Sequence, residues 1–362
     1  MSFPDIEAVQ NRGLAGTVSD AWAGLKYRLG FRDDQDNLVG YLFCLPNIVV
    51  FSIFLLGPVL YAFYLSFTKY SILEGQALLY SVGTINSFLP FSVPFVGGIP
   101  IPGVNNYIQI LTPLPVTVSG GGIQTNFQVF TNPTANTFWW SLKTTTVYAV
   151  GTVPFQILGG LAVALLLDKR IRAKKVYRAA YFMPVMLSGA ASAVIWRWLL
   201  SGQGVINMLL PKFLEHNWAG NPSTALGAVM LMAIWGGIGM NMILFLAGLQ
   251  NIPQELYDAA RIDGANGWHR FRHVTYPNLE NTNFFVLVMA IIGAFQVFGI
   301  AMVFSQGGPY YATTTTVLLI YQRAFEEGHF GVGAAMAMVL FVIIFAFSYY
   351  QYRYRRAEEV EY

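Results

Sequence analysis

The sequence is poor in charge and has almost no cysteine. Charged side chains make up only 11% of its 362 residues, less than half of the about 25% that is usual in soluble domains. Cys44 is the single cysteine, which excludes a disulfide-stapled scaffold. The net charge of +3 comes without a basic stripe carrying interleaved aromatic residues, which argues against nucleic-acid binding. Because 55% of the residues are hydrophobic, these absences predict a polytopic membrane protein.

Stretches without a charged residue locate the expected membrane spans. A hydrocarbon core of about 30 Å is crossed by about 20 apolar residues in a helix. Six charge-free stretches are each long enough to hold one such helix, so we expect an all-α polytopic membrane protein with six transmembrane helices. The expected helices cover residues 39–66, 142–167, 180–200, 224–249, 283–305 and 331–352.

The segment between the first two expected helices is also free of charge, over 75–142, but its composition differs. Gly and Pro recur through it, including the run Gly120, Gly121 and Gly122. Backbone polar groups in lipid must be hydrogen-bonded within a helix or a barrel, and such a sequence cannot provide this. We therefore predict an external insertion over 68–137, folded as an ordered loop or a small cap.

The predicted organisation has five parts. A cytoplasmic tail covers 1–37, the first helix 38–67, the external insertion 68–137, a core of five helices 138–352, and a second cytoplasmic tail 353–362. Most Lys and Arg residues lie in the tails and in two loops, and the positive-inside rule places these parts in the cytoplasm. The first tail is polar and mixed in charge, so we expect no cleavable signal peptide. Apolar residues at helical spacing there fit either an amphipathic helix on the membrane surface or a frayed tail.

The loop over 251–280 carries the most specific pattern in the sequence. Pro253 and Glu255 suit the first turn of a short helix, and Gly264 suits its end. Ala259 and Ala260 would leave the surface of this helix without bulky side chains. Such a surface allows a partner protein to approach closely.

This loop resembles the EAA loop of ATP-binding-cassette (ABC) importer permeases. The family pattern is Glu-Ala-Ala, three residues, Gly, nine residues, Ile, one residue and Leu-Pro. The same spacing occurs here in Asp258, Ala259, Ala260, Gly264, Val274, Tyr276 and Pro277, with Asp, Val and Tyr replacing Glu, Ile and Leu. Residues 138–350 as a whole resemble permeases of carbohydrate importers, the maltose and glycerol-3-phosphate type. The run Asn241–Gln250 and the triplet Gly307-Gly308-Pro309 are among the segments that carry this resemblance.

The resemblance implies a type I ABC importer permease fold and a set of partners. These are a second permease, by family habit in a heterodimer, two ATP-binding-cassette subunits, and an extracellular or periplasmic solute-binding protein. The implied location is a prokaryotic cytoplasmic membrane, with both termini inside. The implied ATPase-coupling residues are Glu255, Asp258, Ala259, Ala260, Asp263, Gly264, Ala265 and Pro277. The sequence has no Gly-Lys pair and hence no P-loop, so we expect ATP and Mg on the partner ATPase, no cofactor in this chain and no enzymatic activity.

Two amides within the expected spans are the candidate substrate contacts. Asn241 lies in the fourth span, and Gln296 lies in the fifth beside Phe295 and Phe298. Polar groups at bilayer depth are costly and often functional, and an amide flanked by aromatic faces suits a sugar. By resemblance, this part of the fifth span lines the substrate cavity. Packing is the alternative, because buried amides often hydrogen-bond across helices.

These observations favour a sugar permease, with a disaccharide or oligosaccharide as substrate. Glycerol-3-phosphate or a polyol handled by the same machinery is the alternative. An ion-coupled carrier is less favoured, because no Asp or Glu falls inside the six expected spans. His269 and His273 share a helical face without a third ligand, so no metal site is predicted.

Overall fold

The computed structural model describes residues 36–70, 77–79, 83–84, 100–101, 104–112, 116–119, 122–125, 128–134, 136–169 and 171–359. The N-terminal residues that fit either an amphipathic helix or a frayed tail lie outside these residues. The chain divides into two units, 1–62 and 63–362, and each is described by itself. In the first unit, helix α2 (Asp36–Phe51) continues through one π-helical turn, η2 (Ser52–Leu56), into α3 (Gly57–Ser66). Residues Phe43–Ser66 are apolar and long enough to cross a membrane, as the sequence predicts.

Three long helices of the second unit also meet the criteria for a membrane span. They are α6 (Thr137–Asp168), α10 (Ala225–Gln250) and α17 (Phe330–Glu359). Two further candidate spans are bent pairs of helices. The first pair is α7 (Lys174–Met186) and α8 (Gly189–Leu199), and in the second α12 (Gly267–Arg270), η5 (Phe271–Thr275) and α13 (Tyr276–Asn278) lead into α14 (Glu280–Phe295). The described residues therefore contain four straight candidate spans, and six if each bent pair is one span.

The expected third span, 180–200, is not one straight helix. Helices α7 and α8 meet at an angle of 96°, and the break lies at Leu187 and Ser188, whose backbones are extended. Pro184 lies three residues before the break. Its backbone nitrogen has no hydrogen to donate, and its ring clashes with the preceding turn. Both effects weaken the helix there. The expected fifth span, 283–305, is also interrupted, because α14 ends at Phe295 and α15 (Gly299–Ser305) begins after a short break.

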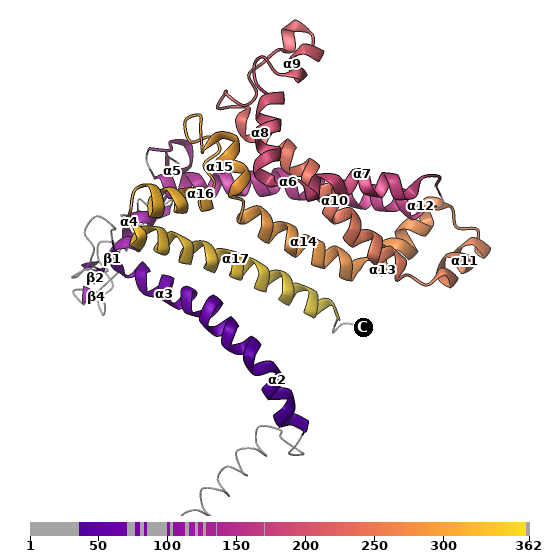
Figure 1. The fold of residues 1–362 in the computed structure, drawn as a ribbon, viewed down its shortest axis with the longest axis horizontal. Coiled ribbons are helices and arrows are strands. Elements are labelled where there is room, and N and C mark those ends of the chain that lie inside the picture. The colour runs from indigo at the N-terminus through magenta and orange to yellow at the C-terminus, as the bar shows by residue number, and fades with distance from the viewer. Residues whose placement is uncertain are drawn as a thin grey trace, which may run out of the picture. The chain divides into compact units, whose positions relative to one another are not determined.

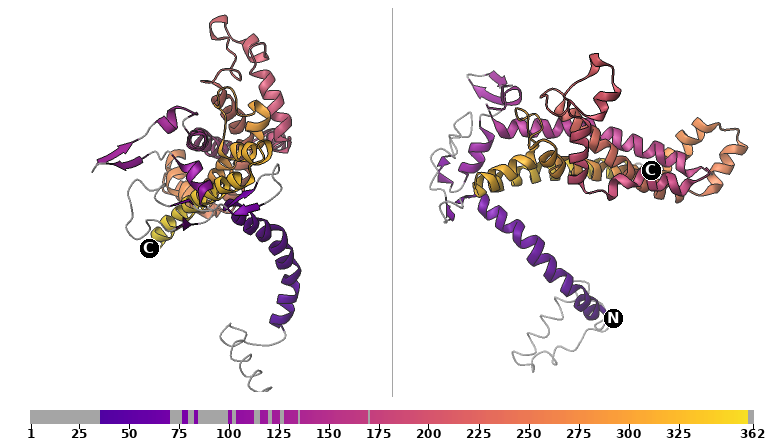
Figure 2. Two further views of the ribbon diagram at one scale, coloured as in Figure 1. Left: turned by 90° about the vertical axis from the view of Figure 1, so that its left-hand side faces the viewer. Right: turned by 45° about the horizontal axis from the view of Figure 1, so that its top comes forward.

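Helices α6, α7, α10, α14 and α17 run alongside one another (Figure 1). The short helices α11 (Gln254–Ile262) and α12 lie at one end of this bundle, and α4 (Asn105–Leu111), α5 (Gln128–Thr131) and α16 (Thr316–Tyr321) lie at the other end (Figures 1 and 2). Helices α6 and α10 pack closely at Gly160, where an added Cβ would lie 2.5 Å from the Asn241 Cβ. Gly239 of α10 brings α7 equally close, because a Cβ there would lie 2.2 Å from the Tyr181 carbonyl oxygen.

The segment 68–137, which the sequence analysis predicts to be an external insertion, contains strands that the sequence does not predict. Three two-stranded antiparallel pairs are β1 (Thr68–Tyr70) with β2 (Ala77–Leu79), β3 (Gly83–Thr84) with β4 (Pro100–Ile101), and β5 (Val116–Ser119) with β6 (Gly122–Thr125). All are four residues or shorter, and period-2 patterns of that length cannot be recognised reliably in a sequence. The expected all-α class is therefore correct for the helical bundle and incomplete for the insertion.

Helix α4 fastens the insertion to the bundle. The Asn106 side chain donates to the carbonyl oxygens of Ser66 (2.8 Å) and Thr68 (3.0 Å), at the C-terminal end of α3. The Asn136 side chain, which caps α6, donates to the carbonyl oxygens of Ile110 and Thr112. Helix α17 begins against the same group, because a Cβ on Gly331 would lie 2.0 Å from the Thr68 carbonyl oxygen.

The remaining described elements lie in the loops between spans. Helix α9 (Val205–Leu209) and the 3₁₀ turn η4 (Lys212–Leu214) lie between α8 and α10. The π-helical turn η6 (Gln322–Glu326) follows α16 and precedes α17.

Candidate functional site

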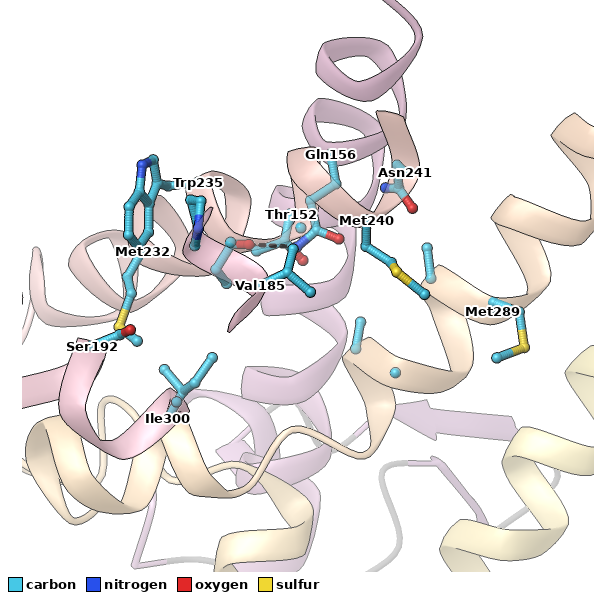
Figure 3. A pocket seen from close by; sticks show the side chains of 18 of the residues that line it. Thr152, Gln156, Val185, Ser192, Met232, Trp235, Met240, Asn241, Met289 and Ile300 are labelled. Carbon is cyan, nitrogen blue, oxygen red and sulfur yellow. Dashed lines mark hydrogen bonds between the residues drawn. The ribbon is translucent and has the colours of Figure 1, made fainter. Parts of the chain in front are cut away.

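A cavity of about 460 Å³ lies within the helical bundle of the second unit. Its walls come from α6, α7, α8, α10, α14 and α15 (Figure 3). The volume falls within the range of about 300–1,000 Å³ that is typical of small-molecule sites. The cavity is therefore large enough to hold a small ligand at the centre of the bundle.

The cavity wall carries no Asp, Glu, Lys, Arg or His side chain. Its hydrogen-bonding side chains belong mainly to Thr152, Gln156, Ser192 and Asn241, and its remaining wall is largely apolar. A charged ligand loses its hydration on entry and needs an opposite charge to replace it. The described wall offers none, so this chain's part of the site suits an uncharged ligand.

Asn241, one of the predicted substrate contacts, lies on the cavity wall. Its side chain is only 7% exposed, and its buried Nδ2 has no hydrogen-bond partner among the described residues. A buried donor without a partner costs about 1–3 kcal/mol. The nitrogen has almost no accessible surface in this arrangement, so a ligand hydroxyl would accept its hydrogen bond, and remove that cost, once a small movement opened the amide to the cavity.

Thr152 and Gln156 of α6 lie on the same cavity wall, and the sequence reasoning missed them. The Gln156 Nε2 donates to the Ala233 carbonyl oxygen of α10 at 3.0 Å, which fixes the amide between the two helices. The Thr152 hydroxyl donates to the Tyr148 carbonyl oxygen at 2.8 Å. The signal that could have found them is an amide, Gln156, inside a charge-free span, with the Thr152 hydroxyl one helical turn before it. An amide inside a span is also what indicated Asn241.

The other three predicted contacts do not line this cavity. Gln296 lies at the end of α14 with an exposed side chain, and its backbone N–H donates to the Ile292 carbonyl oxygen. Phe295 packs against an apolar cluster that includes Tyr148 of α6 and Val229 of α10. The Phe298 ring lies 5.2 Å from the Tyr321 ring, between centroids. The structure thus separates Gln296 and its aromatic neighbours from Asn241.

The predicted coupling loop forms a short helix that begins and ends where the sequence indicates. Pro253 caps the start of α11, Glu255 lies in its first turn, and Gly264 follows its end with a φ of +76°. The Ala265 N–H donates to the Ala260 carbonyl oxygen at 2.9 Å, which closes the last turn. Asp258 forms an ion pair with Arg261, with 2.9 Å between Oδ1 and Nη1.

The surface of this loop is rich in exposed apolar groups. Ala259 is exposed, and Ile262 is 87% exposed just before the end of α11. Asp263, at the end of the helix, and Pro277, in α13, are exposed as well. The Tyr257 hydroxyl and the Thr275 hydroxyl hydrogen-bond at 3.1 Å and fasten α11 to η5. The predicted coupling residues thus lie at one end of the bundle, in a loop whose two helical segments are hydrogen-bonded to each other (Figure 1).

The same loop holds His269 and His273, whose rings stack with 6.0 Å between centroids. Each Nδ1 already has a local hydrogen-bond partner, the Asn266 Oδ1 and the His269 carbonyl oxygen respectively. No group of three or more His, Cys, Asp or Glu side chains that could hold a metal ion occurs in the described part of the chain.

Comparison with known proteins gives matches over most of the chain. The family model for the binding-protein-dependent transport system inner membrane component matches residues 138–358. The arabinooligosaccharides transport system permease protein AraP of Bacillus subtilis is 31% identical over 330 residues, which cover 89% of this chain and 90% of AraP. The trehalose/maltose transport system permease protein MalF of Thermococcus litoralis is 29% identical over 315 residues, covering 86% of this chain and 90% of MalF.

A solved structure shares the fold. In the bacterial alginate ABC transporter in complex with an alginate pentasaccharide-bound periplasmic protein, one chain matches with a TM-score of 0.64 at 17% identity, covering 87% of this chain and 93% of that chain. The family match spans more than half of the sequence and includes the EAA-like loop and the whole cavity wall. The resemblance inferred from the loop is therefore confirmed, and the chain belongs to the family of binding-protein-dependent transport system inner membrane components, the membrane-spanning permeases of ABC transporters.

Proposed function

We propose that this chain is the permease subunit of an ATP-driven importer that moves a neutral sugar, a disaccharide or oligosaccharide, through the cavity lined by α6, α7, α8, α10, α14 and α15. The observation that carries the proposal is a charge-free cavity wall with the unpartnered Asn241 amide. The permeases AraP and MalF, named for arabinooligosaccharide and trehalose/maltose transport, support a sugar as the substrate. The glycerol-3-phosphate alternative has less support, because the phosphate would find no cation on this wall.

The proposed machine contains more than this chain. A second permease, in a heterodimer, completes the pathway, two ATPase subunits bind the coupling loops, and an external binding protein delivers the sugar. ATP binding closes the ATPase pair and moves α11, and the helical bundle switches between an inward-facing and an outward-facing arrangement. Such switching is a rigid-body change between two packed states. Both termini and the coupling loop lie in the cytoplasm, as the distribution of Lys and Arg predicts.

The test is uptake into proteoliposomes that contain this chain with its co-purified partners. We expect accumulation of a labelled neutral disaccharide only when ATP is supplied to the ATPase side and the binding protein is on the opposite side. A polyol or glycerol-3-phosphate in excess should not compete. Sugar uptake that follows an imposed proton or sodium gradient without ATP would contradict the proposal and would instead support an ion-coupled carrier.

A further inference from the structure

The cavity wall carries two sets of side chains that differ in rigidity as well as in polarity: Thr152, Gln156 and Asn241 form its polar side, and Met240 and Met289 its methionine side. Figure 3 shows Thr152 and Gln156 of α6 close together, Asn241 and Met240 of α10 next to them, and Met289 of α14 beyond Met240. The two methionine side chains come from different spans, and both are about half exposed, at 49% and 52%. The third methionine of the wall, Met232, is buried at the opposite end beside Ser192.

The polar side is held in place by the packing of α6 against α10. The hydrogen bond to the Ala233 carbonyl oxygen orients the Gln156 amide, and Gly237 leaves the space that this side chain fills, since a Cβ there would lie 2.5 Å from the Gln156 Cδ. Asn241 lies against Gly160, where no larger residue fits without displacement. These groups therefore have little freedom to follow ligands of different shape.

The methionine side has the opposite property. Methionine is unbranched, has three rotatable side-chain bonds and carries a polarisable sulfur, so it adapts to irregular apolar surfaces. About half of the surface of each methionine is accessible within this chain, so neither residue is locked in place by surrounding side chains. The C–H faces of sugar rings are the part of a neutral saccharide that such a wall contacts, while its hydroxyl groups need the polar side.

We propose that Met240 and Met289 form an adaptable wall that allows the cavity to accept neutral saccharides of more than one ring shape, while Gln156 and Asn241 fix each ligand through its hydroxyl groups. The inference rests on the proposed function, because it assigns the specificity of the same cavity. It makes the two methionines specificity-determining residues, and it predicts a broad rather than a single-sugar site.

The test is direct binding of a panel of neutral disaccharides and trisaccharides to the purified transporter in nanodiscs without the binding protein, so that only the membrane site selects. One extra or missing methylene in an apolar pocket is worth about 10–200-fold. We expect the adaptable wall to reduce this discrimination, so that the wild-type dissociation constants lie within about tenfold of one another across the panel. Met240→Ile and Met289→Ile introduce stiff, branched side chains of similar volume. The double variant should retain at least one sugar and lose about tenfold or more in affinity for others.

Met208→Ile is the matched control, because Met208 is an exposed methionine of α9 that does not line the cavity. A wild type that binds one sugar of the panel alone would overturn the inference and leave the proposed function intact. Equal weakening of every sugar in the methionine variants would overturn it as well, since this is the result for simple packing. Failure of every sugar to bind, together with unchanged uptake in Gln156→Leu, would overturn the cavity as the substrate site and therefore both proposals.

Discussion

At the scale of single residues, the cavity shows what a sequence can reveal about a membrane site. Asn241 stood out because an amide inside a charge-free span is costly in lipid, and the structure places it on the cavity wall. Gln156 gives the same signal and could have been found in the same way. Gln296 gives it too, but α14 ends at Phe295, and Gln296 is exposed and does not line the cavity. Which amide points inward depends on helix breaks that composition does not encode.

Substitution of Asn241 tests its role as a donor to the substrate. Asn241→Leu removes the buried Nδ2 and should weaken sugar affinity by about 1–3 kcal/mol, roughly 5- to 150-fold, because the ligand hydroxyl loses its partner. Folding should be unimpaired, because no hydrogen bond to that nitrogen is lost. The measurement is the dissociation constant for a labelled sugar in the intact complex.

Gln296→Leu is the matched control, since it removes an amide of the fifth span that does not line the cavity. We expect its sugar affinity to equal that of the wild type. Equal sugar affinity in both variants would show that Asn241 has only a packing role. A loss of sugar affinity in Gln296→Leu alone would place the substrate site near Phe295 and Phe298 instead.

At the scale of elements, the structure of the predicted coupling loop agrees closely with the prediction from the sequence, and the membrane spans agree with it in part. Proline, an acidic residue and glycine mark the start and end of α11 through local backbone chemistry, which a sequence displays directly. The stretches without charged residues locate α6, α10 and α17, because a sequence also displays its hydropathy directly. The bend between α7 and α8 follows Pro184, but its angle of 96° depends on packing between distant segments, which no local pattern contains.

An added side chain on α11 tests whether this helix docks the ATPase. Ala260→Arg should leave membrane insertion intact and reduce ATP-dependent transport by about 30-fold or more, because a bulky charge in a packed interface costs at least about 2 kcal/mol. The measurements are uptake and the amount of ATPase that co-purifies with this chain. Gln203→Arg, an exposed position between α8 and α9, controls for the added charge. Normal uptake by Ala260→Arg at normal membrane abundance would contradict the docking role.

At the scale of the whole molecule, the insertion is joined to the bundle through buried polar contacts of the second unit. Asn106 and Asn136 hydrogen-bond to backbone carbonyl groups of segments far away in the sequence, and the Tyr107 hydroxyl donates to the Ser66 Oγ at 2.7 Å. Burial raises the pKa of the Tyr107 phenol above its ordinary value, against a smaller opposing effect of the Ser66 hydrogen bond. Tyr107 therefore stays protonated and remains a donor at neutral pH. The sequence indicates an ordered insertion but contains no sign of these partners.

Loss of the Asn106 contacts should loosen this attachment. Asn106→Ala removes two hydrogen bonds to the carbonyl oxygens of Ser66 and Thr68 and should cost about 1–3 kcal/mol, since both carbonyl groups are left in a buried environment. We expect a fall in the apparent unfolding temperature of about 2–8 °C in detergent, followed by intrinsic fluorescence. Asn132→Ala, which removes only a local turn contact at the surface, should leave it unchanged. An equal unfolding temperature for both variants would show that α4 does not hold the insertion.

The charge-free wall of the cavity also has an electrical consequence. Moving one elementary charge across a membrane potential of 100 mV involves about 2.3 kcal/mol. The described cavity wall has no Asp, Glu, Lys, Arg or His side chain, so neither this wall nor the proposed neutral sugar would carry a charge across the membrane. The proposed function therefore predicts a substrate step that is electroneutral on this side of the pathway. Sugar uptake by the proposed importer should then depend on ATP and not on the voltage across the membrane.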